Sequence, residues 1–572
     1  MATETSTDFQ VLANNPKAQF TLKLHRGESM LLLAMNWKNG KPPKDFVGFT
    51  IEYKEPGGDK FYSLKNRICF LDKNGKPQKN SSSTLQAPIQ KFRWVHFPRN
   101  AELEGEFIYK VKPVFMNDSD ELSYGESQQA KIRLARETYK GKVNVCFTRG
   151  FVSSQAFVDK YVADGSVKEL LPAKAKLGVD FKPTHPKTKE ALEWMGFEAR
   201  EAILKLLDQA IADKKAKVKV VAYDLSQAEV VAKLEKLGSR LEIIIDDSKE
   251  HGEHDSGETI AEKRLSKRGT QVKRQHMGQL QHNKTIVVDG PKIKAALCGS
   301  TNYTWRGLYV QANHAVIVYG PQAIQPFLAA FDNYWNNGTP ATFGATPSAD
   351  WQDLNIDGLD AKVAFSPHSA ENVLLDTIAD DMKGSESNLL YSLAFLFQTP
   401  GVMQNTIKAL MKKTKLFIYG ISDKKVGGLD IQTPNGNIAP VFAEELSKNL
   451  PEPFKSEPTG GGGTRMHHKF VVIDFDKPTA RVYFGSYNFS QTADNSNGEN
   501  LVCIQDRKIA VAFMIEALRL FDHYHFRISV KQAKAKKKVL ALQKPPRKAS
   551  EQAWWEEYYK DKRKIRDREL FA

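Results

Sequence analysis

Cysteine is scarce in this sequence, and long apolar runs are absent from it. Only four cysteines occur among 572 residues, and no two of them form a CxxC pair. Each lies in an apolar, strand-like run: Cys69, Cys146, Cys298 and Cys503. This usage argues against a disulfide framework and predicts reduced thiols in the core of a cytosolic protein.

Signals for export and membrane insertion are also missing. No stretch approaches the ~20 apolar residues that a membrane-spanning helix needs. The N-terminal sequence MATETSTDFQ lacks the basic region and apolar run of a signal peptide. We therefore expect a cytoplasmic protein with no transmembrane segment.

Basic residues outnumber acidic ones, and the formal net charge is +16. The rest of the composition is ordinary for a globular protein, with 41% hydrophobic and 26% charged residues. The length suits about three to four domains. The charge favours a polyanionic partner, either nucleic acid or an acidic membrane surface. The alternative is a basic protein with no such partner.

Residues 1–137 show β signals. Aromatic and branched residues alternate with polar ones in several runs, as in Phe49, Ile51 and Tyr53, and Gly, Pro, Asn and Asp clusters separate these runs. The pattern predicts a small all-β sandwich that loosely resembles a fibronectin type III or immunoglobulin-like module. Such a module would bind or dock a protein partner. A structural cap on the rest of the chain is the alternative.

From residue 138 the pattern becomes α/β, and it occurs twice. Strand-like runs alternate with helix-like runs over residues 138–345, and a similar order returns over residues 346–528. The closing helix also recurs, since FDNYW near residue 333 matches FDHYH near residue 523. We therefore predict two duplicated α/β halves, each with a mostly parallel sheet. Residues 529–572 form a basic, aromatic tail.

Two blocks of the chain repeat one polar pattern. Residues 281–302 read QHNKTIVVDGPKIKAALCGSTN, and residues 465–488 read RMHHKFVVIDFDKPTARVYFGSYN. Each reads His-x-Lys, four mostly apolar residues, Asp, a short polar turn, a strand, and Gly-Ser-x-Asn. The matched positions are His282 and His467, Lys284 and Lys469, Asp289 and Asp474, Gly299 and Gly485, Ser300 and Ser486, and Asn302 and Asn488.

This pair of blocks resembles the duplicated HKD motif of the phospholipase D superfamily, and GSYNFSQTA is most similar to its nuclease members. The resemblance implies two halves packed face to face about a pseudo-twofold axis, so that one chain supplies both motifs to one site. It implies cleavage of phosphodiester bonds in nucleic acids or phospholipids without a metal or other cofactor. Because one chain holds both motifs, either a monomer or a homodimer fits.

The chemistry explains these residue types. Two histidines can divide the work of nucleophile and general acid at a phosphodiester, because the pKa of imidazole lies near neutrality. A lysine two residues along a strand points to the same face as its histidine and can hold a phosphate oxygen. The predicted catalytic residues are His282, Lys284, Asp289, His467, Lys469 and Asp474.

Roles within this set come from the resemblance. The family's habit makes His282 the nucleophile and His467 the general acid, and the sequence alone leaves the order open. The two aspartates would orient histidines or fix the structure. The predicted supporting residues are Ser300, Asn302, Ser486, Asn488 and Glu499. Many relatives carry an acid where Glu499 lies, whereas the matching position of the first half is Asn313, so the support of the two histidines is expected to differ.

Basic segments lie beside the first motif and at the C-terminus. Residues 247–281 read as a polar loop, and residues 460–463 form a glycine run before the second motif. The loop's predicted nucleic-acid contacts are Lys263, Arg264, Lys267, Arg268, Lys273 and Arg274. The tail's Trp554, Trp555, Tyr558 and Tyr559 either stack on bases or pack on the protein. In the same loop, His251 and His254 are interpreted as solvated rather than as metal ligands, so no metal is predicted.

The preferred interpretation is a metal-independent nuclease acting through a phosphohistidine, with DNA favoured over RNA. Family habit, and not these residues, would place it in restriction or defence. Two alternatives stay open: a phospholipase D or phosphatidyl transferase, and an inactive nucleic-acid-binding scaffold.

Overall fold

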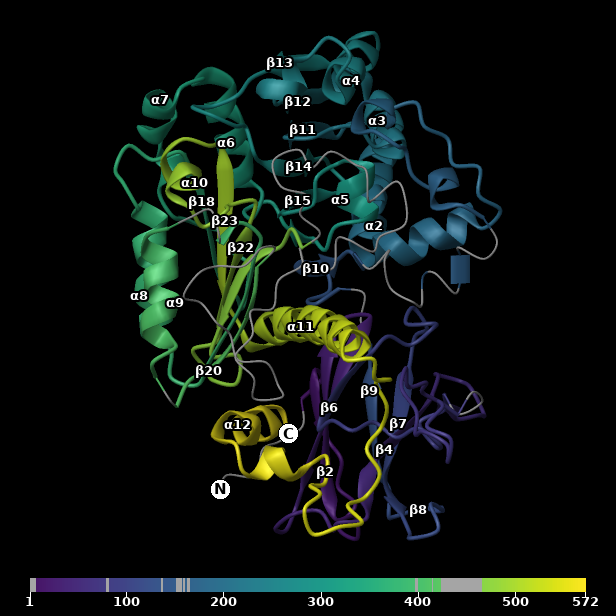
Figure 1. The fold of residues 1–572 in the computed structure, drawn as a ribbon. Coiled ribbons are helices and arrows are strands. Elements are labelled where there is room, and N and C mark those ends of the chain that lie inside the picture. The colour runs from purple at the N-terminus through teal and green to yellow at the C-terminus, as the bar shows by residue number, and fades with distance from the viewer. Residues whose placement is uncertain are drawn as a thin grey trace. The chain divides into compact units, whose positions relative to one another are not determined.

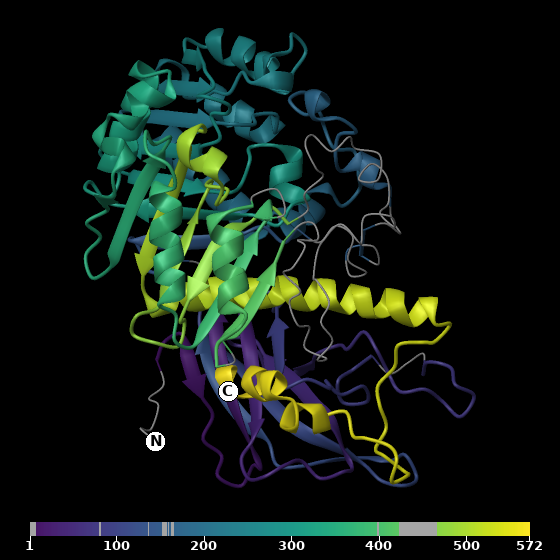
Figure 2. The same cartoon turned by 60° about the vertical axis from the view of Figure 1, so that its left-hand side comes forward.

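The computed structural model describes residues 7–78, 82–134, 137–150, 157, 160–161, 165–396, 400–413, 415–422 and 466–572 (Figures 1 and 2). Contacts within the chain divide it into two compact units. The described part of the β-sandwich unit contains residues 7–134 and 511–572. The described part of the α/β unit lies between residues 137 and 510. The division falls inside helix α11 (Arg507–Ala535).

Two antiparallel sheets form the β-sandwich unit, as the alternating N-terminal runs predict. The first sheet has the order β1-β2-β3-β6. Its strands are β1 (Gln10–Leu12), β2 (Phe20–Gly27), β3 (Met30–Trp37) and β6 (Arg93–His96). The second has the order β5-β4-β7-β8, and β9 also pairs with β7. Its strands are β4 (Phe46–Lys54), β5 (Tyr62–Ser63), β7 (Glu106–Met116), β8 (Leu122–Tyr124) and β9 (Gln128–Arg133). One apolar core joins both sheets, with the rings of Phe20 and Phe49 5.2 Å apart.

The C-terminal segment belongs to this sandwich. It contains a short helix, η9 (Glu556–Tyr559), and α12 (Lys562–Phe571). Trp555 is buried in the sandwich core, and the Trp554 ring lies 5.3 Å from that of Phe92. Arg93 also binds Asp567 at 2.8 Å. The tail's aromatic residues therefore pack on the protein, which is the second of the two uses that the sequence left open.

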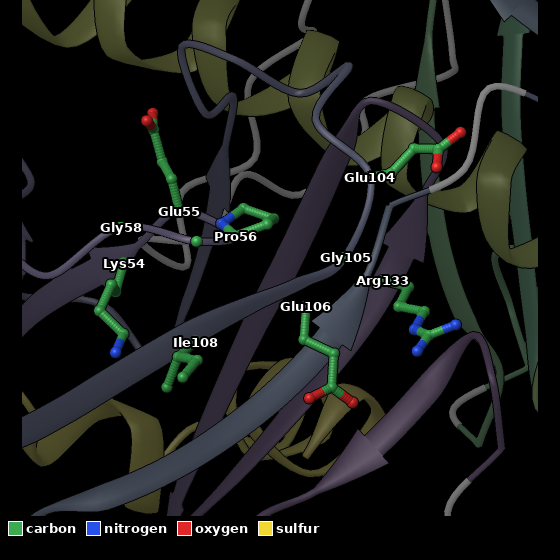
Figure 3. A pocket seen from close by; sticks show the side chains of 10 residues that line it. Lys54, Glu55, Pro56, Gly58, Glu104, Gly105, Glu106, Ile108 and Arg133 are labelled. Atoms are coloured by element: carbon green, nitrogen blue, oxygen red, sulfur yellow. The ribbon is translucent and has the colours of Figure 1, made fainter.

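An open hollow of about 580 Å³ lies in the sandwich unit (Figure 3). Charges of both signs line it, including Lys54, Arg133, Glu104 and Glu106. It contains no residue of either histidine motif, so it is not the candidate active site.

The first half of the α/β unit is built on a seven-stranded sheet with the order β10-β16-β15-β14-β11-β12-β13 (Figure 1). Its strands are β10 (Val143–Phe147), β11 (Lys217–Ala222), β12 (Leu241–Ile245), β13 (Gln271–Arg274), β14 (Lys284–Asp289), β15 (Lys294–Gly299) and β16 (His314–Tyr319). Its helices are α2 (Thr188–Ala212), α3 (Ala228–Glu235), α4 (Gly257–Ser266), α5 (Trp305–Tyr309), α6 (Gln325–Asn336) and α7 (Pro340–Gly344). The apolar face of α2 lies in the core of this half.

The second half repeats this order. Its sheet runs β17-β18-β23-β22-β21-β19-β20. The strands are β17 (Gln352–Asp353), β18 (Asp360–Ser366), β19 (Asn388–Leu393), β20 (Phe417–Ile421), β21 (Lys469–Ile473), β22 (Arg481–Gly485) and β23 (Glu499–Gln505). Helices α8 (Val373–Lys383) and α9 (Val402–Leu410) lie side by side along one face of this sheet, and α10 (Gln491–Asn495) follows β22 (Figures 1 and 2). The order from β18 to β20 matches that from β10 to β12, so the predicted duplication is confirmed.

The prediction of mostly parallel sheets is wrong. Among the strands that the structure describes, only β11–β12 and β12–β13 are parallel in the first half, and only β19–β20 is parallel in the second. The strands that carry the motifs are joined by short turns, as at Gly290, whose amide donates to the Ile293 carbonyl at 2.9 Å. A short turn reverses the chain and pairs the strands antiparallel, whereas a parallel pair needs a long crossover. Alternation of strands and helices does not reveal which connections are hairpins.

The basic segment upstream of the first motif is not a loop. It contains α4 and the edge strand β13, which pairs with β12 in the register Ile243↔Val272. The glycine run at residues 460–463 lies outside the described residues. Among the helices that the structure describes, none is both long and apolar enough to cross a bilayer.

Candidate active site

Both motifs meet in the α/β unit, and their histidines and lysines are buried. His282 and His467 are each 4% exposed, and Lys284 and Lys469 are each 1% exposed. Each lysine is the first residue of its strand, β14 or β21, and its histidine lies two residues earlier. The equivalent positions in the two sheets therefore present the same pair of side chains.

Short bridges between the halves bring each histidine to a residue of the other half. Gln281, which precedes His282, pairs with Gly498, and Met466, which precedes His467, pairs with Ala312. The residue after Gly498 is Glu499, and the residue after Ala312 is Asn313. Each half therefore supplies a partner for the Nδ1 atom of the other half's histidine.

His282 is held by a carboxylate. Its Nδ1 lies 2.7 Å from Oε2 of Glu499, which is fully buried. An ionised carboxylate only accepts hydrogen bonds, so this contact places a proton on Nδ1 and leaves Nε2 as the basic nitrogen. The structure thus brings the predicted support residue Glu499 to the first histidine.

His467 is held by neutral oxygens. Its Nδ1 lies 2.8 Å from Oδ1 of Asn313 and 3.1 Å from the carbonyl of Ser300. Both atoms accept, so Nδ1 again carries the proton, and Nε2 accepts a hydrogen bond from Lys469 at 3.1 Å. Ser300 donates to Oδ1 of the same Asn313 at 2.9 Å. The asymmetry expected from the sequence is therefore one of a carboxylate against an amide.

The Gly-Ser pair of each motif lets the next strand approach closely. A Cβ on Gly299 would lie 2.4 Å from the carbonyl oxygen of His314, and one on Gly485 would lie 2.2 Å from that of Asn500. Both contacts are shorter than a carbon and an oxygen tolerate, so only glycine fits. The hydroxyl of Ser486 accepts from the Asn500 amide at 3.0 Å.

Both lysines sit in low-dielectric surroundings. Lys284 donates to the His282 carbonyl and lies 4.6 Å from the ring centre of Tyr223. Lys469 donates to the His467 carbonyl at 2.9 Å and lies 5.4 Å from the ring of Phe395. Burial lowers the pKa of Lys284 to about 8, and burial together with Lys284 holds the pKa of Lys469 well below its usual value.

The other titratable groups respond to the same burial. Burial, reinforced by the two lysines, holds the pKa values of both histidines well below their usual range. Burial raises the pKa of Glu499 to about 7, although Lys284 opposes this shift. A buried cluster rich in basic groups and with a single carboxylate between the motifs therefore disfavours its own positive charges.

The two motif aspartates do not lie with the histidines. Asp474 is buried and accepts hydrogen bonds from the amides of Glu386, Ser387 and Asn388 at 2.8–2.9 Å. Asp289 is half-exposed and pairs with Lys294. Asp474 thus anchors the start of β19, and Asp289 lies at the far end of β14.

The motif asparagines differ in their surroundings. Asn302 is buried, and its Nδ2 donates to Oδ2 of Asp224. Among the described residues, no hydrogen-bond partner is found for Oδ1 of Asn302 or for Oδ1 of Asn488. Either amide can therefore turn a free polar group toward a ligand.

The six basic residues upstream of the first motif fall into two groups. Arg264 pairs with Glu235 at 2.6 Å, Arg274 pairs with Glu262 at 3.0 Å, and Lys273 donates to the Trp335 carbonyl. The other three are exposed at the surface: Lys263, Lys267 and Arg268. Only this second group presents its charge fully to solvent.

Sequence reasoning missed a charged cluster beside the first motif. His251 is not solvated: its Nδ1 lies 2.8 Å from Asp246 and its Nε2 lies 2.7 Å from Asp224. Ligand atoms of Asp224, His251 and Glu258 lie within 4.8 Å of one another, which is close enough for a metal ion. Burial opposes a charge on His251, but Asp224 and Asp246 outweigh it and raise the pKa to about 11. The imidazolium is thus the cation of this cluster. No sequence spacing reveals it, because its members are brought together by three separate segments.

Comparison with known proteins places the motifs in a family. Residues 203–335 and 394–520 match the family model described as "Cardiolipin synthase, PLD-like domain". A curated "Phospholipase D" of Rickettsia prowazekii (strain Madrid E) is 42% identical over 48 residues, which are 8% of this chain and 22% of that protein. The chain thus spans about a fifth of the length of this relative.

Two solved structures illustrate the range of similar folds. Nuc from Salmonella typhimurium, described as a phospholipase D family member, is 22% identical with a TM-score of 0.21, over 24% of this chain and 88% of that one. The phosphatidylserine synthase of Haemophilus influenzae Rd KW20 is 14% identical with a TM-score of 0.39, over 60% of this chain and 94% of that one. Because the family model matches each half in turn, the two halves of the α/β unit belong to the phospholipase D superfamily.

Proposed function

We propose that the α/β unit is a metal-independent phosphodiesterase that cleaves nucleic acid, with DNA favoured, through a phosphohistidine intermediate. One observation carries the proposal: two histidines and two lysines are buried together, and the buried carboxylate of Glu499 contacts one of the histidines. Burial lowers the pKa values of all four basic groups, and repulsion from the lysines adds to this shift at His282, His467 and Lys469. A bound phosphodiester anion relieves this repulsion, so the cluster is complementary to such a substrate.

The hydrogen bonds support the following proposed steps. Nε2 of His282 attacks phosphorus, and the negative charge of Glu499 stabilises the ring as it gains a bond. His467, once protonated on Nε2, gives that proton to the leaving oxygen as its bond to phosphorus breaks. His467 then takes a proton from water, and the hydroxide releases the phosphate from His282. Lys284 and Lys469 hold the non-bridging oxygens throughout.

A nucleic-acid substrate is favoured over a lipid by charge and by the few exposed apolar side chains in the described part of the α/β unit. The chain carries a net charge of +16, and Lys263, Lys267 and Arg268 are exposed on the segment that leads to the first motif. Among the described residues of the α/β unit, the large apolar side chains that are exposed are Leu177 and Val373. An enzyme working at a lipid interface needs a contiguous apolar face.

A phospholipid substrate is the second candidate. The matched family model carries a cardiolipin synthase description, and the curated relative is named a phospholipase D. Both names concern those proteins, and the site chemistry derived above serves either class of phosphodiester. The substrate therefore needs a direct test.

The test is cleavage of labelled single- and double-stranded DNA and RNA in EDTA, beside choline release from phosphatidylcholine vesicles. Nucleic-acid cleavage that persists in EDTA and disappears in the His282→Ala and His467→Ala variants is expected. Choline release without nucleic-acid cleavage would replace the proposal with the lipid candidate. Inactivity toward every substrate would leave the third reading, an inactive scaffold.

A further inference from the structure

We propose that Asp224, His251 and Asp246 form a relay that positions the amide of Asn302 for the substrate phosphate. The relay makes the first motif the more rigid side of the site. This inference rests on the proposed function and adds to it that Asn302 donates a hydrogen bond to a phosphate oxygen. Asp224, His251 and Asp246 act through Asn302 and are positioning residues.

Asp246 is the fixed end of the relay. It is fully buried at the end of β12, and Oδ2 accepts from the amide of Gln281 at 2.6 Å. Its Oδ1 accepts from the amide of Ser248 at 2.8 Å and from Nδ1 of His251 at 2.8 Å. Gln281 immediately precedes His282, so this carboxylate ties the relay to the backbone of the first motif.

His251 links the two carboxylates. Both of its ring nitrogens face carboxylate oxygens, which only accept hydrogen bonds, so both nitrogens carry protons. The ring also meets Tyr223 edge to face at 4.6 Å, and Tyr223 meets His282 in the same way at 4.6 Å. Packing and two charge-assisted hydrogen bonds therefore fix the imidazolium, and they fix Oδ1 of Asp224 with it.

Asp224 then selects one end of the Asn302 amide. Oδ2 accepts from Nδ2 of Asn302, and an acceptor-only carboxylate cannot bind the carbonyl end of that amide. The amide nitrogen has a second hydrogen, which remains for a phosphate oxygen. Without the relay, the amide can turn its carbonyl toward the phosphate, and that contact is repulsive.

The second half has no equivalent of Asp224 at the matching position. Ala222 pairs with Lys284, and Leu393 pairs with Lys469, so the residues two positions later, Asp224 and Phe395, correspond. The ring of Phe395 lies 6.0 Å from that of His467 and accepts no such hydrogen bond from an amide. The relay is thus built at the first motif, and it gives the two asparagines different surroundings.

A double-mutant cycle tests the relay. The variants are Asn302→Ala, His251→Gln and the pair together, and the readout is kcat and KM for bis(p-nitrophenyl) phosphate in EDTA. Loss of one phosphate donor is expected to lower kcat about 10²-fold. Misplacing that donor through His251→Gln is expected to lower it about 10-fold, and in the Asn302→Ala background His251→Gln should change nothing further.

His254→Gln is the matched control, because His254 is exposed and lies three residues from His251. It should leave kcat unchanged. Asp224→Asn is the second variant and should behave as His251→Gln does, since it removes the acceptor-only group. Circular dichroism confirms that each variant is folded, and a misfolded His251→Gln is replaced by Asp224→Asn in the cycle.

Independent losses that multiply in the double variant would overturn the relay while leaving the phosphodiesterase intact. Full activity of both His251→Gln and Asp224→Asn would do the same, and so would stoichiometric binding of Zn²⁺ or Mn²⁺ that raises wild-type kcat, since a metal would then replace the imidazolium. Should the wild type cleave no phosphodiester, the proposed function fails, and the cycle is run on vanadate affinity by calorimetry. Coupling between His251 and Asn302 in that affinity would still support the relay, and its absence would refute it.

Discussion

The two halves of the α/β unit have the same strand order but hold their histidines with different chemistry. Glu499 reaches His282 from the second half, and Asn313 reaches His467 from the first. Backbone bridges at Gly498 and at Ala312 place these two partners equivalently. The fold thus fixes the position of the partner residue. The type of side chain at that position determines its chemical effect on the histidine.

A carboxylate and an amide do different work beside an imidazole. In the proposed mechanism, the charge of Glu499 stabilises a His282 ring that becomes positive, which suits a nucleophile that forms a bond to phosphorus. The neutral oxygen of Asn313 orients His467 without holding a proton on its other nitrogen, which suits a group that gives its proton away and takes one back. Symmetry of the backbone therefore supports two unequal roles.

Replacing either histidine should cause the largest loss of activity. His282→Ala and His467→Ala are each expected to lower kcat by at least about 10⁴-fold, since each removes a reacting group. A test for a covalent phosphate after an alkaline quench, in which phosphohistidine is stable, should separate the two variants. With a substrate whose leaving group needs no proton, His467→Ala should accumulate a phosphohistidine at His282, because water is no longer deprotonated.

His282→Ala should form no such adduct with any substrate. Mass spectrometry of the quenched protein reads out the modified residue. An adduct on His467 in the His282→Ala variant would reverse the assigned roles. It would also contradict the role proposed for Glu499.

The next largest effect should come from the partners. Glu499→Gln is expected to lower kcat about 10³-fold, because the charge that stabilises His282 is lost. Asn313→Ala is expected to cost only about 10-fold, the loss of one neutral hydrogen bond. Equal losses in the two variants, measured by steady-state kinetics, would mean that the carboxylate has no special role.

The pH profile of kcat/KM also tests the role of the Glu499 carboxylate. Glu499 has a pKa raised to about 7 by burial, and it must be ionised to act, so activity should rise as the pH passes through about 7. Lys284 has a pKa lowered to about 8 by burial, and it must be protonated to hold phosphate, so activity should fall above about 8. Glu499→Gln should remove the acidic limb, and Lys284→Arg should remove the contribution of Lys284 to the basic limb.

The Glu499 shift also affects folding. Between pH 4.5 and about 7 the folded chain binds this proton more tightly than the unfolded chain does, so the free energy of unfolding should fall as the pH rises through that window. If the pH profile of kcat/KM keeps its acidic limb in the Glu499→Gln variant, that limb belongs to another group near the site.

The sequence predicted the local features well. The histidines, lysines and glycines stand in contiguous blocks, and a duplicated block reveals itself by comparison with its copy. Glu499 was identified from the resemblance to the family, and Asn313 from the matching position in the first half. The β-sandwich and the alternating strands and helices of each half followed from periodicity, which is a local property.

What the sequence did not predict depends on segments that meet only in the fold. The sheets are mixed because hairpins join the motif strands, and apolar alternation looks the same in either direction. His251 seemed solvated because its neighbours in the chain are polar, yet Asp224 and Asp246 come from the ends of two other strands. The aromatic tail carried the composition of a nucleic-acid contact, and only the sandwich core shows that Trp555 is buried.

The smallest effects should distinguish the two motif aspartates, which match in sequence but not in surroundings. Asp474 is buried and accepts hydrogen bonds from three backbone amides. Asp474→Asn leaves donors unsatisfied there, so it should lower the free energy of unfolding by about 3 kcal/mol. Asp289 pairs with Lys294 near the surface, where an ion pair contributes little, so Asp289→Asn should cost less than about 1 kcal/mol. Urea unfolding of the α/β unit measures both.

Under conditions where each variant stays folded, kcat should remain near the wild-type value, because neither carboxylate touches a histidine. A large loss of kcat in folded Asp289→Asn would show that this residue serves the chemistry after all, and the two halves would then be more alike than their contacts indicate.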